Sequence, residues 1–248
     1  MWEEHSNAPS LSKIDVHVWK FPLNQPRTII NCLAAHLSGD ETERAARFHF
    51  LQGKDHYIIA RGVLRALLGG YLAISPAQVT FTYSAHGKPS LDESHGSDVS
   101  FNLTHSGALA LIAVTRNARI GVDIEQYRPD FEGLRIADRF FAPQECAYLR
   151  AQPETCRAEA FIRQWTRKES FIKGRGEGLS YPLNAFHVLD GDSSTTLRLT
   201  ISDDPIESAR WTIRDLHLTE NFAGALAVER DKPEVALFAC DVEAIALK

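Results

Sequence analysis

The spacing of apolar residues changes several times along this chain, and each change predicts a different element. Apolar residues occupy every second position from 14 to 18, which is typical of a half-buried strand. From 40 to about 68 the apolar residues follow helical spacing, and the glycine pair at 69–70 predicts the end of the helix. Further strands are predicted at 79–83, 99–103, 108–115 and 120–125. A tight turn is expected at 104–107, where the pattern becomes polar.

The second half begins with helical spacing and ends with strand-like runs. Helices are predicted over 134–141, 143–151 and 154–173. Strands are predicted at 186–189, 197–201, 211–218 and 222–228. The glycines at 174, 176 and 178 follow a helix, whereas phosphate-cradling glycine loops precede one, so we interpret them as a helix C-cap and loop.

These elements predict an α+β protein with two lobes, residues 1–117 and 118–248. The tetrapeptide Gly107-Ala-Leu-Ala110 recurs as Gly224-Ala-Leu-Ala227, inside a predicted buried strand each time. Such a short repeat can arise by chance. It can also indicate that the chain consists of two similar halves. In the second case each lobe would be a small antiparallel sheet packed with helices.

Composition excludes several classes of protein. The chain has 248 residues, with 27 Lys and Arg against 32 Asp and Glu, and this acidic balance argues against bulk nucleic-acid binding. The four cysteines form no Cys-x-x-Cys pair, which favours buried thiols in a reducing compartment. The start of the chain lacks the apolar core of a signal peptide, and the longest apolar run, 108–114, is too short to cross a bilayer. We therefore expect a cytoplasmic protein without nucleic-acid or membrane partners.

Two carboxylates share one face of the predicted strand 120–125. Asp123 and Glu125 are two residues apart, so their side chains point to the same side, about 6.5–7 Å apart at the backbone. Like charges at this spacing repel unless solvent or a cation separates them. An exposed strand face is the ordinary explanation. Gly121 on the same face would let another backbone or a ligand approach closely.

A third carboxylate lies on the apolar stripe of the predicted helix 154–173. Glu169 follows Trp165 by four residues and precedes Ile172 by three. A carboxylate that faces the interior is costly unless it is paired or hydrogen-bonded. Lys173, four residues later, is a possible partner, and an ordinary Glu–Lys helix pair explains both residues equally well.

Five motifs in order resemble the surfactin-type 4′-phosphopantetheinyl transferases. They are Gly87-Lys-Pro89, Phe101-Asn-Leu-Thr-His-Ser106, Gly121-Val-Asp-Ile-Glu125, Trp165-Thr-Arg-Lys-Glu-Ser170 with Phe171-Ile-Lys-Gly174, and Gly178-Leu179 with Pro182-Leu183. The resemblance implies a two-lobed monomer of pseudo-twofold symmetry with a coenzyme A site between the lobes. It also implies transfer of the phosphopantetheine arm of coenzyme A to a serine of an acyl or peptidyl carrier protein, which releases adenosine 3′,5′-bisphosphate.

The resemblance also implies roles for individual residues. Asp123, Glu125 and Glu169 would bind Mg²⁺, Glu169 would help to deprotonate the carrier serine, and Lys173 would contact the pyrophosphate. Asp123, Glu169 and Lys173 would thus be the catalytic group. Coenzyme A would be contacted by Lys173 and by Arg47, Lys54, Arg61, Lys88, Pro89, Thr104 and His105. Many members carry an Asp-Arg-like pair where this chain has Gln52-Gly-Lys-Asp55, so Arg47 or Lys54 is expected to replace it at the 3′-phosphate.

Other functions stay open at this stage. A coenzyme-A-binding or carrier-binding protein of the same fold would keep the residues without the reaction. Another Mg²⁺-dependent phosphoryl or nucleotidyl enzyme would use similar carboxylates. A local basic patch is expected to dock the acidic carrier, with Arg128, Arg163 and Arg167 as candidates. The sequence does not indicate whether the carrier serves fatty-acid, polyketide or peptide synthesis.

Overall fold

The chain folds into two compact units, each built from both strands and helices. The computed structural model describes residues 1–127, 133–190 and 197–247. The first unit comprises residues 1–83, 89–117 and the segment that begins at Glu234, and the second comprises residues 84–88 and 118–233. The units are therefore not the two consecutive halves expected from the sequence, because the last strand returns to the first sheet. The expected α+β class is confirmed in both units.

The first unit contains a five-stranded sheet and a set of helices. Its strands are β1 (Glu3–His5), β2 (Asp15–Pro22), β3 (Phe81–Tyr83), β4 (Pro89–Leu91), β5 (Val99–Ser106), β6 (Leu109–Arg116) and β12 (Glu234–Cys240). Its helices are α1 (Arg27–Ala34), α2 (Gly39–Ala46), α3 (Leu51–Leu72), α8 (Val242–Ala246) and the short 3₁₀ turns η1 (Pro76–Gln78) and η2 (Glu93–His95).

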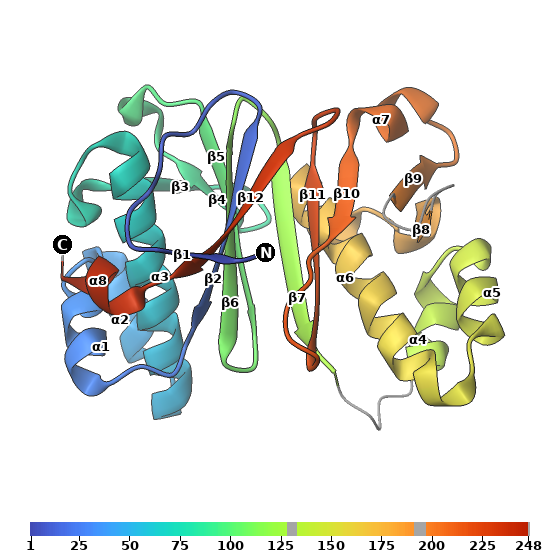
Figure 1. Cartoon of the computed structure of the whole chain (residues 1–248), viewed down its shortest axis with the longest axis horizontal. Coiled ribbons are helices and arrows are strands. Elements are labelled where there is room, and N and C mark those ends of the chain that lie inside the picture. Colours follow the sequence, from blue (N-terminus) through green and yellow to red (C-terminus); the bar gives the residue numbers. More distant parts are fainter. Residues whose placement is uncertain (128–132, 191–196, 248) are drawn as a thin grey trace. The chain divides into compact units, whose positions relative to one another are not determined.

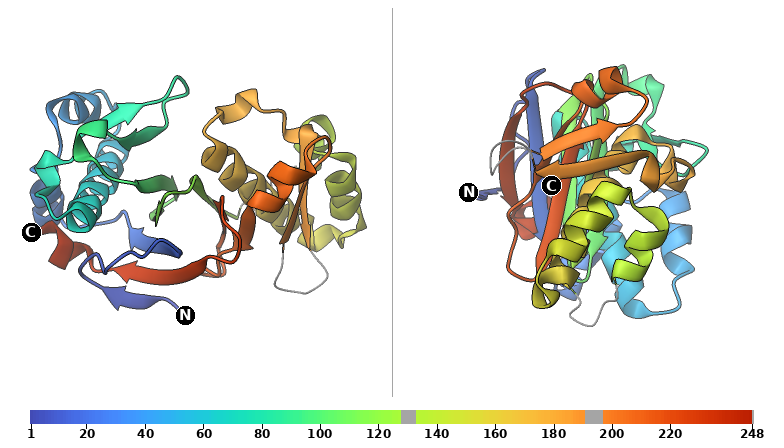
Figure 2. Two further views of the ribbon diagram at one scale, coloured as in Figure 1. Left: turned by 90° about the horizontal axis from the view of Figure 1, so that it is seen from above. Right: turned by 90° about the vertical axis from the view of Figure 1, so that its right-hand side faces the viewer.

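The first sheet has the order β1-β12-β2-β6-β5. Strand β12 pairs in parallel with both β1 and β2, so this sheet is mixed rather than purely antiparallel as expected. The helices α1, α2, α3 and α8 lie on one side of β2, β6 and β12 (Figures 1 and 2). Between these two layers lies the apolar core, in which Trp19, Phe21 and Leu64 are almost completely buried.

The helical region predicted at 40–68 consists of two helices with a break at residues 47–50. A buried ionic cluster holds the two helices together, since Glu41 of α2 pairs with both Arg61 and Arg65 of α3. Arg65 also donates hydrogen bonds to the carbonyl oxygens of Pro76 and Val79. The guanidinium donors and the carboxylate therefore satisfy one another in a place where an isolated charge would be costly.

The second unit contains a three-stranded sheet, a separate hairpin, four α-helices and three 3₁₀ turns among the described residues. Its strands are β7 (Ile120–Gln126), β8 (Phe186–Asp190), β9 (Leu197–Ile201), β10 (Thr212–Asp215) and β11 (Phe222–Val228). Its helices and 3₁₀ turns are α4 (Gly133–Phe140), α5 (Pro143–Ala151), η3 (Glu154–Cys156), α6 (Arg157–Arg175), η4 (Gly178–Ser180), η5 (Leu183–Ala185) and α7 (Pro205–Arg210).

Helix α6 is the central element of the second unit and runs beside the antiparallel sheet β10-β11-β7 (Figure 1). Phe171 and Ile172 of α6 pack with Trp211 in one apolar cluster, and Phe161 belongs to another. Lys168 and Glu145 form a fully buried ion pair of 2.6 Å, which ties α6 to α5. The Lys168 ammonium also donates to the carbonyl oxygen of Phe186 on β8, so its charge is well hydrogen-bonded.

The glycines at 174, 176 and 178 behave only in part as the sequence predicts, because Gly174 lies inside α6 whereas Gly176 is its C-cap. Helix α6 ends at Gly176, which adopts a left-handed conformation with φ of 80°. Within the part of the chain that is described, no helix is both long and apolar enough to cross a membrane.

Candidate active site

Strand β7 and helix α6 touch backbone to backbone, and this contact creates the acidic cluster of the second unit. A Cβ atom at Gly121 would lie 2.1 Å from the carbonyl oxygen of Ser170 and 2.2 Å from the amide nitrogen of Gly174. Only glycine permits this approach. The strand neighbours that share its face, Ala225 and Ala227 of β11, are also small. The helix therefore packs directly onto the strand face that carries Asp123 and Glu125.

Asp123 is buried by this packing instead of lying on an exposed strand face. Asp123 is only 2% exposed, and its Oδ1 accepts a hydrogen bond of 2.6 Å from the Lys173 ammonium. The sequence suggested that Lys173 pairs with Glu169 on its own helix. At 2.6 Å its ammonium instead pairs with Asp123 of the strand. Because Lys173 is itself partly exposed, the pair couples a buried anion to a cation that faces solvent.

Glu169 lies in the electrostatic field of the same group of charges. The pKa of Glu169 is raised to about 6, chiefly by burial and also by the negative charges of Asp123 and Glu125, against the lowering effect of Lys173. Its Oε1 atom is buried without a hydrogen-bond partner among the described residues. A carboxyl group with this pKa is deprotonated at neutral pH and still basic enough to accept a proton.

The carboxylate oxygens of this acidic cluster are suitable ligands for a hard divalent cation. Carboxylate oxygens are the protein ligands that Mg²⁺ prefers, and Asp123, Glu125 and Glu169 act on one another electrostatically. Among the residues that are described, no three His, Cys, Asp or Glu side chains already have the spacing of a metal site. The charges thus fit the ion, and binding by all three residues requires their side chains to turn toward it.

Lys88 also belongs to the second unit, and its ammonium lies among backbone carbonyls. It donates to the carbonyl oxygens of Ile120 at 3.1 Å, Lys173 at 2.5 Å and Gly174 at 3.2 Å. The pKa of Lys88 is lowered to about 8, chiefly by burial and also by the positive charge of Arg119. The contact with coenzyme A that the resemblance implies stays a prediction for this residue.

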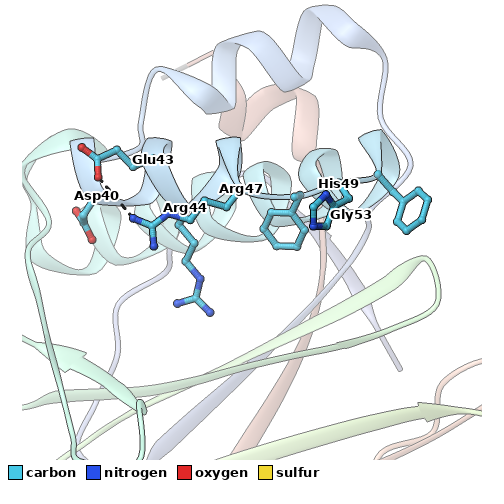
Figure 3. A pocket seen from close by; sticks show the side chains of 8 residues that line it. Asp40, Glu43, Arg44, Arg47, His49 and Gly53 are labelled. Atoms are coloured by element: carbon cyan, nitrogen blue, oxygen red, sulfur yellow. Dashed lines mark ion pairs between the residues drawn. The ribbon is translucent and has the colours of Figure 1, made fainter.

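In the first unit, Arg47 lines a cavity of about 710 Å³ beside helix α2. Figure 3 shows Asp40, Glu43, Arg44 and Arg47 along this helix, with His49 in the connection to α3. Arg47 makes a long ion pair of 3.9 Å with Glu43, and both side chains are exposed. Such a pair is weak, so the arginine is available to an anionic ligand. Arg44 also lines this cavity, and it was not singled out from the sequence.

Two other residues of the first unit that were predicted to contact coenzyme A, Arg61 and Lys54, differ in burial and in their partners. Arg61 is buried and bound to Glu41, and it also donates to the Tyr83 hydroxyl. Its charge supports helix α2, which carries Arg44 and Arg47. Lys54 is half-buried near the start of α3. The capping-box sequence Ser38-Gly-Asp-Glu41 could have predicted where α2 begins, because Glu41 accepts from the Ser38 amide.

Thr104 and His105 lie in strand β5, and Pro89 is the first residue of β4. The turn expected at 104–107 is wrong, because β5 continues to Ser106 and pairs with β6 up to Leu109. A strand alternates its side chains, so Thr104 is buried whereas His105 is exposed. The exposed imidazole is accessible to a ligand, as the resemblance implies.

The candidate docking arginines have different environments. Arg167 is buried and bound to Asp215 and Asp190, so the prediction that it contacts the carrier at the surface is wrong. Arg163 is exposed and pairs with Glu159 one helical turn earlier. Arg128 lies outside the described residues. The sequence could not separate Arg163 from Arg167, because both lie on one helix and its covering strands are distant in sequence.

Comparison with known proteins adds independent information. Residues 119–227 match the model of the 4′-phosphopantetheinyl transferase superfamily, and residues 23–117 match the model of the 4′-phosphopantetheinyl transferase N-terminal region. The chain is 44% identical over 221 residues to the 4′-phosphopantetheinyl transferase HetI of Nostoc sp. strain PCC 7120, covering 86% of this chain and 87% of HetI. It is 31% identical over 170 residues to the 4′-phosphopantetheinyl transferase Sfp of Bacillus subtilis strain 168, covering 68% and 74% of the two chains.

Proposed function

We propose, from the premise that this chain belongs to the 4′-phosphopantetheinyl transferase superfamily, that Asp123, Glu169 and Lys173 form its catalytic centre. The family resemblance that the motifs indicate is confirmed. The chain is a 4′-phosphopantetheinyl transferase, which moves the phosphopantetheine arm of coenzyme A to a serine of a carrier protein. The roles of its individual residues, the metal ion and the identity of the carrier are the content of the proposal.

The reaction needs one proton acceptor and compensation for one growing negative charge. The serine oxygen forms a bond to the phosphorus atom that carries the pantetheine arm, and the bond from that phosphorus to the bridging pyrophosphate oxygen breaks. The serine proton leaves for a base, and adenosine 3′,5′-bisphosphate departs with the bridging oxygen. A serine hydroxyl is a weak nucleophile, so a base within hydrogen-bond reach accelerates the step.

Glu169 is the residue that we assign as this base. Its raised pKa of about 6 is the observation that supports the proposal most directly, because it reflects a carboxylate held in a buried, negatively charged setting. A surface glutamate would hold a proton far more weakly. The unpartnered Oε1 atom offers an acceptor that the protein itself does not use.

Lys173 supplies positive charge, and Asp123 fixes the position of that charge. The ion pair of 2.6 Å directs the ammonium toward the acidic cluster, where a pyrophosphate would bring further negative charge. We assign Asp123, Glu125 and Glu169 as the residues that would hold Mg²⁺, which would offset negative charge on the pyrophosphate oxygens. The mutual repulsion of these carboxylates supports the assignment, since a cation would relieve it.

We also assign residues of the first unit to the nucleotide end of coenzyme A, as the resemblance implies. We assign the 3′-phosphate to Arg47 together with Arg44, because both line the same cavity and guanidinium groups bind phosphates through paired hydrogen bonds. His105 and Lys54 remain assigned to coenzyme A as predicted from the resemblance. Arg61 acts through Glu41, which positions the helix that carries the two arginines.

The test is transfer to a purified apo carrier protein in the presence of coenzyme A and Mg²⁺. Intact-mass spectrometry should show the carrier gaining one phosphopantetheine group with the wild-type protein. Glu169→Gln should abolish the gain, whereas Glu159→Gln, a change to an exposed residue of the same helix, should not. A panel of carriers from fatty-acid, polyketide and peptide synthesis identifies the pathway by its catalytic efficiency.

Two results would contradict the assignment. Calorimetric binding of coenzyme A without transfer to any carrier would favour the non-catalytic alternative. Full activity of Glu169→Gln would remove that residue from the chemistry. A monomeric state and a cytoplasmic location also belong to the proposal, and sedimentation analysis and cell fractionation test them.

A further inference from the structure

The C-terminal turn of helix α6 presents backbone carbonyl groups that the helix cannot satisfy. The last four carbonyls of any α-helix lack partners within it. Here the Ile172 carbonyl accepts from the Gly176 amide at 3.0 Å. The carbonyls of Lys173 and Gly174 instead accept from the ammonium of Lys88. A side chain distant in sequence therefore completes the end of this helix.

The same ammonium reaches the first residue of strand β7. Its third hydrogen bond goes to the Ile120 carbonyl at 3.1 Å. An ammonium group has three N–H donors, and each donor of Lys88 thus has a backbone acceptor. The side-chain stem passes Gly176, where an added Cβ would lie 3.6 Å from the Lys88 Cδ atom. A positive charge at this place also interacts favourably with the negative end of the helix dipole.

These contacts join the two segments that carry the catalytic group. Lys173 contributes its carbonyl to Lys88 and its ammonium to Asp123. Asp123 lies three residues after Ile120 on the same strand. We propose that Lys88 is a positioning residue, which clamps the end of α6 to the start of β7 and thereby aligns Lys173 with Asp123 for transfer. This inference rests on the proposed function of that group.

A direct contact between Lys88 and a coenzyme A phosphate would have different consequences. A phosphate ligand contributes to binding of coenzyme A, so its loss raises KM and the dissociation constant. A clamp on the catalytic group contributes to the alignment of reacting groups, so its loss lowers kcat. The three hydrogen bonds of this partly buried ammonium favour the clamp, because Lys88 would have to give up its carbonyl partners to reach a phosphate.

The experiment compares Lys88→Met with the wild type in steady-state transfer at 25 °C. Methionine keeps the apolar stem and removes all three donors. We expect kcat to fall by at least about tenfold, with KM for coenzyme A changed by less than about threefold. The dissociation constant of coenzyme A, measured by calorimetry without a carrier, should follow KM. A tenfold rise in KM or in the dissociation constant at unchanged kcat would overturn the clamp and assign Lys88 to the phosphate.

A matched control separates alignment from general stability. Leu199→Ala removes packing from the apolar core of the same unit without touching Lys88 or its acceptors. It should lower the melting temperature while kcat at 25 °C stays near that of the wild type. An equal loss of kcat in both variants at matched melting temperature would show that Lys88 has only a structural role.

The remaining outcomes are also decisive. Should Lys88→Met not fold, Lys88→Gln keeps an N–H donor and should show the same loss of kcat in a milder form. Unchanged kcat and KM in a folded Lys88 variant would overturn the inference while the proposed function stands. A wild-type protein that modifies no carrier would overturn the proposed function and this inference with it.

Discussion

Removing the charge of Glu169 should stabilise the metal-free protein, although it should abolish catalysis. The substitution Glu169→Gln keeps the size of the side chain and its capacity to accept a hydrogen bond. It removes a carboxylate whose ionised form is disfavoured by burial and by the negative charges of Asp123 and Glu125. The variant therefore imitates the protonated carboxyl, which the folded protein holds more tightly than the unfolded chain does.

The size of the effect follows from the pKa. A pKa of Glu169 raised from 4.5 to about 6 corresponds to roughly 2 kcal/mol of unfolding free energy. Because the folded state holds this proton more tightly than the unfolded state, the stabilisation from the neutral carboxyl is fully present below pH 4.5 and is lost as the pH rises through 6. Glu169→Gln should thus gain up to about 2 kcal/mol at pH 7.5 and less than about 0.5 kcal/mol near pH 4.5.

Urea unfolding with a chelator, followed by tryptophan fluorescence, measures this difference. Both proteins are unfolded at several pH values between 4.5 and 7.5, and the urea dependence of the free energy should be equal for the two. Glu159→Gln is the control, because Glu159 is an exposed residue of the same helix and its loss should cost less than about 1 kcal/mol. A variant that is less stable than wild type at pH 7.5, or a gain that does not depend on pH, would refute the reasoning.

Four further predictions concern the same residues and their surroundings. Millimolar Mg²⁺ should raise the melting temperature of the wild type and have little effect on Glu169→Gln, since binding to the folded state alone stabilises it; equal shifts in both would argue against a metal held by this residue. Lys173→Ala should lower kcat by about a hundredfold through lost charge compensation, and unchanged turnover would remove Lys173 from the site. Arg47→Ala should raise KM about tenfold for coenzyme A but not for 3′-dephospho-coenzyme A, and equal changes for both substrates would exclude a 3′-phosphate contact. Gly121→Ala should destabilise the second unit by more than about 3 kcal/mol in urea, because its methyl group would meet the backbone of α6; wild-type stability would contradict that contact.

Several features of the site could be predicted because they depend on short stretches of chain. The period of two over 120–125 places Asp123 and Glu125 on one face, and the helical period places Glu169 and Lys173 on one side of α6. The glycines at 174, 176 and 178 predicted a C-cap, and Gly176 is that C-cap, although the helix extends beyond its expected end at 173. The order of the motifs was sufficient to identify the family, since each motif is a local sequence of a few residues.

Other features depend on which element covers a given face, and local patterns do not contain that information. The sequence predicts ligand contacts for Arg61 and Arg167, yet both are buried in ion pairs with Glu41 and Asp215. The break between α2 and α3 was missed, because the helical spacing of apolar residues continues on both sides of it. The return of β12 to the first sheet also involves residues that are more than two hundred positions apart.

The sequence by itself determined the chemistry of this protein: three carboxylates, a lysine and their order within recognisable motifs. Only the tertiary structure decided that Lys173 pairs with Asp123, and that Lys88 meets the end of α6. The physical reason is that periodicity specifies the direction of a side chain relative to its own backbone. Its partner is specified by packing, and here the packing depends on the missing side chain of Gly121, which lets the helix reach the strand.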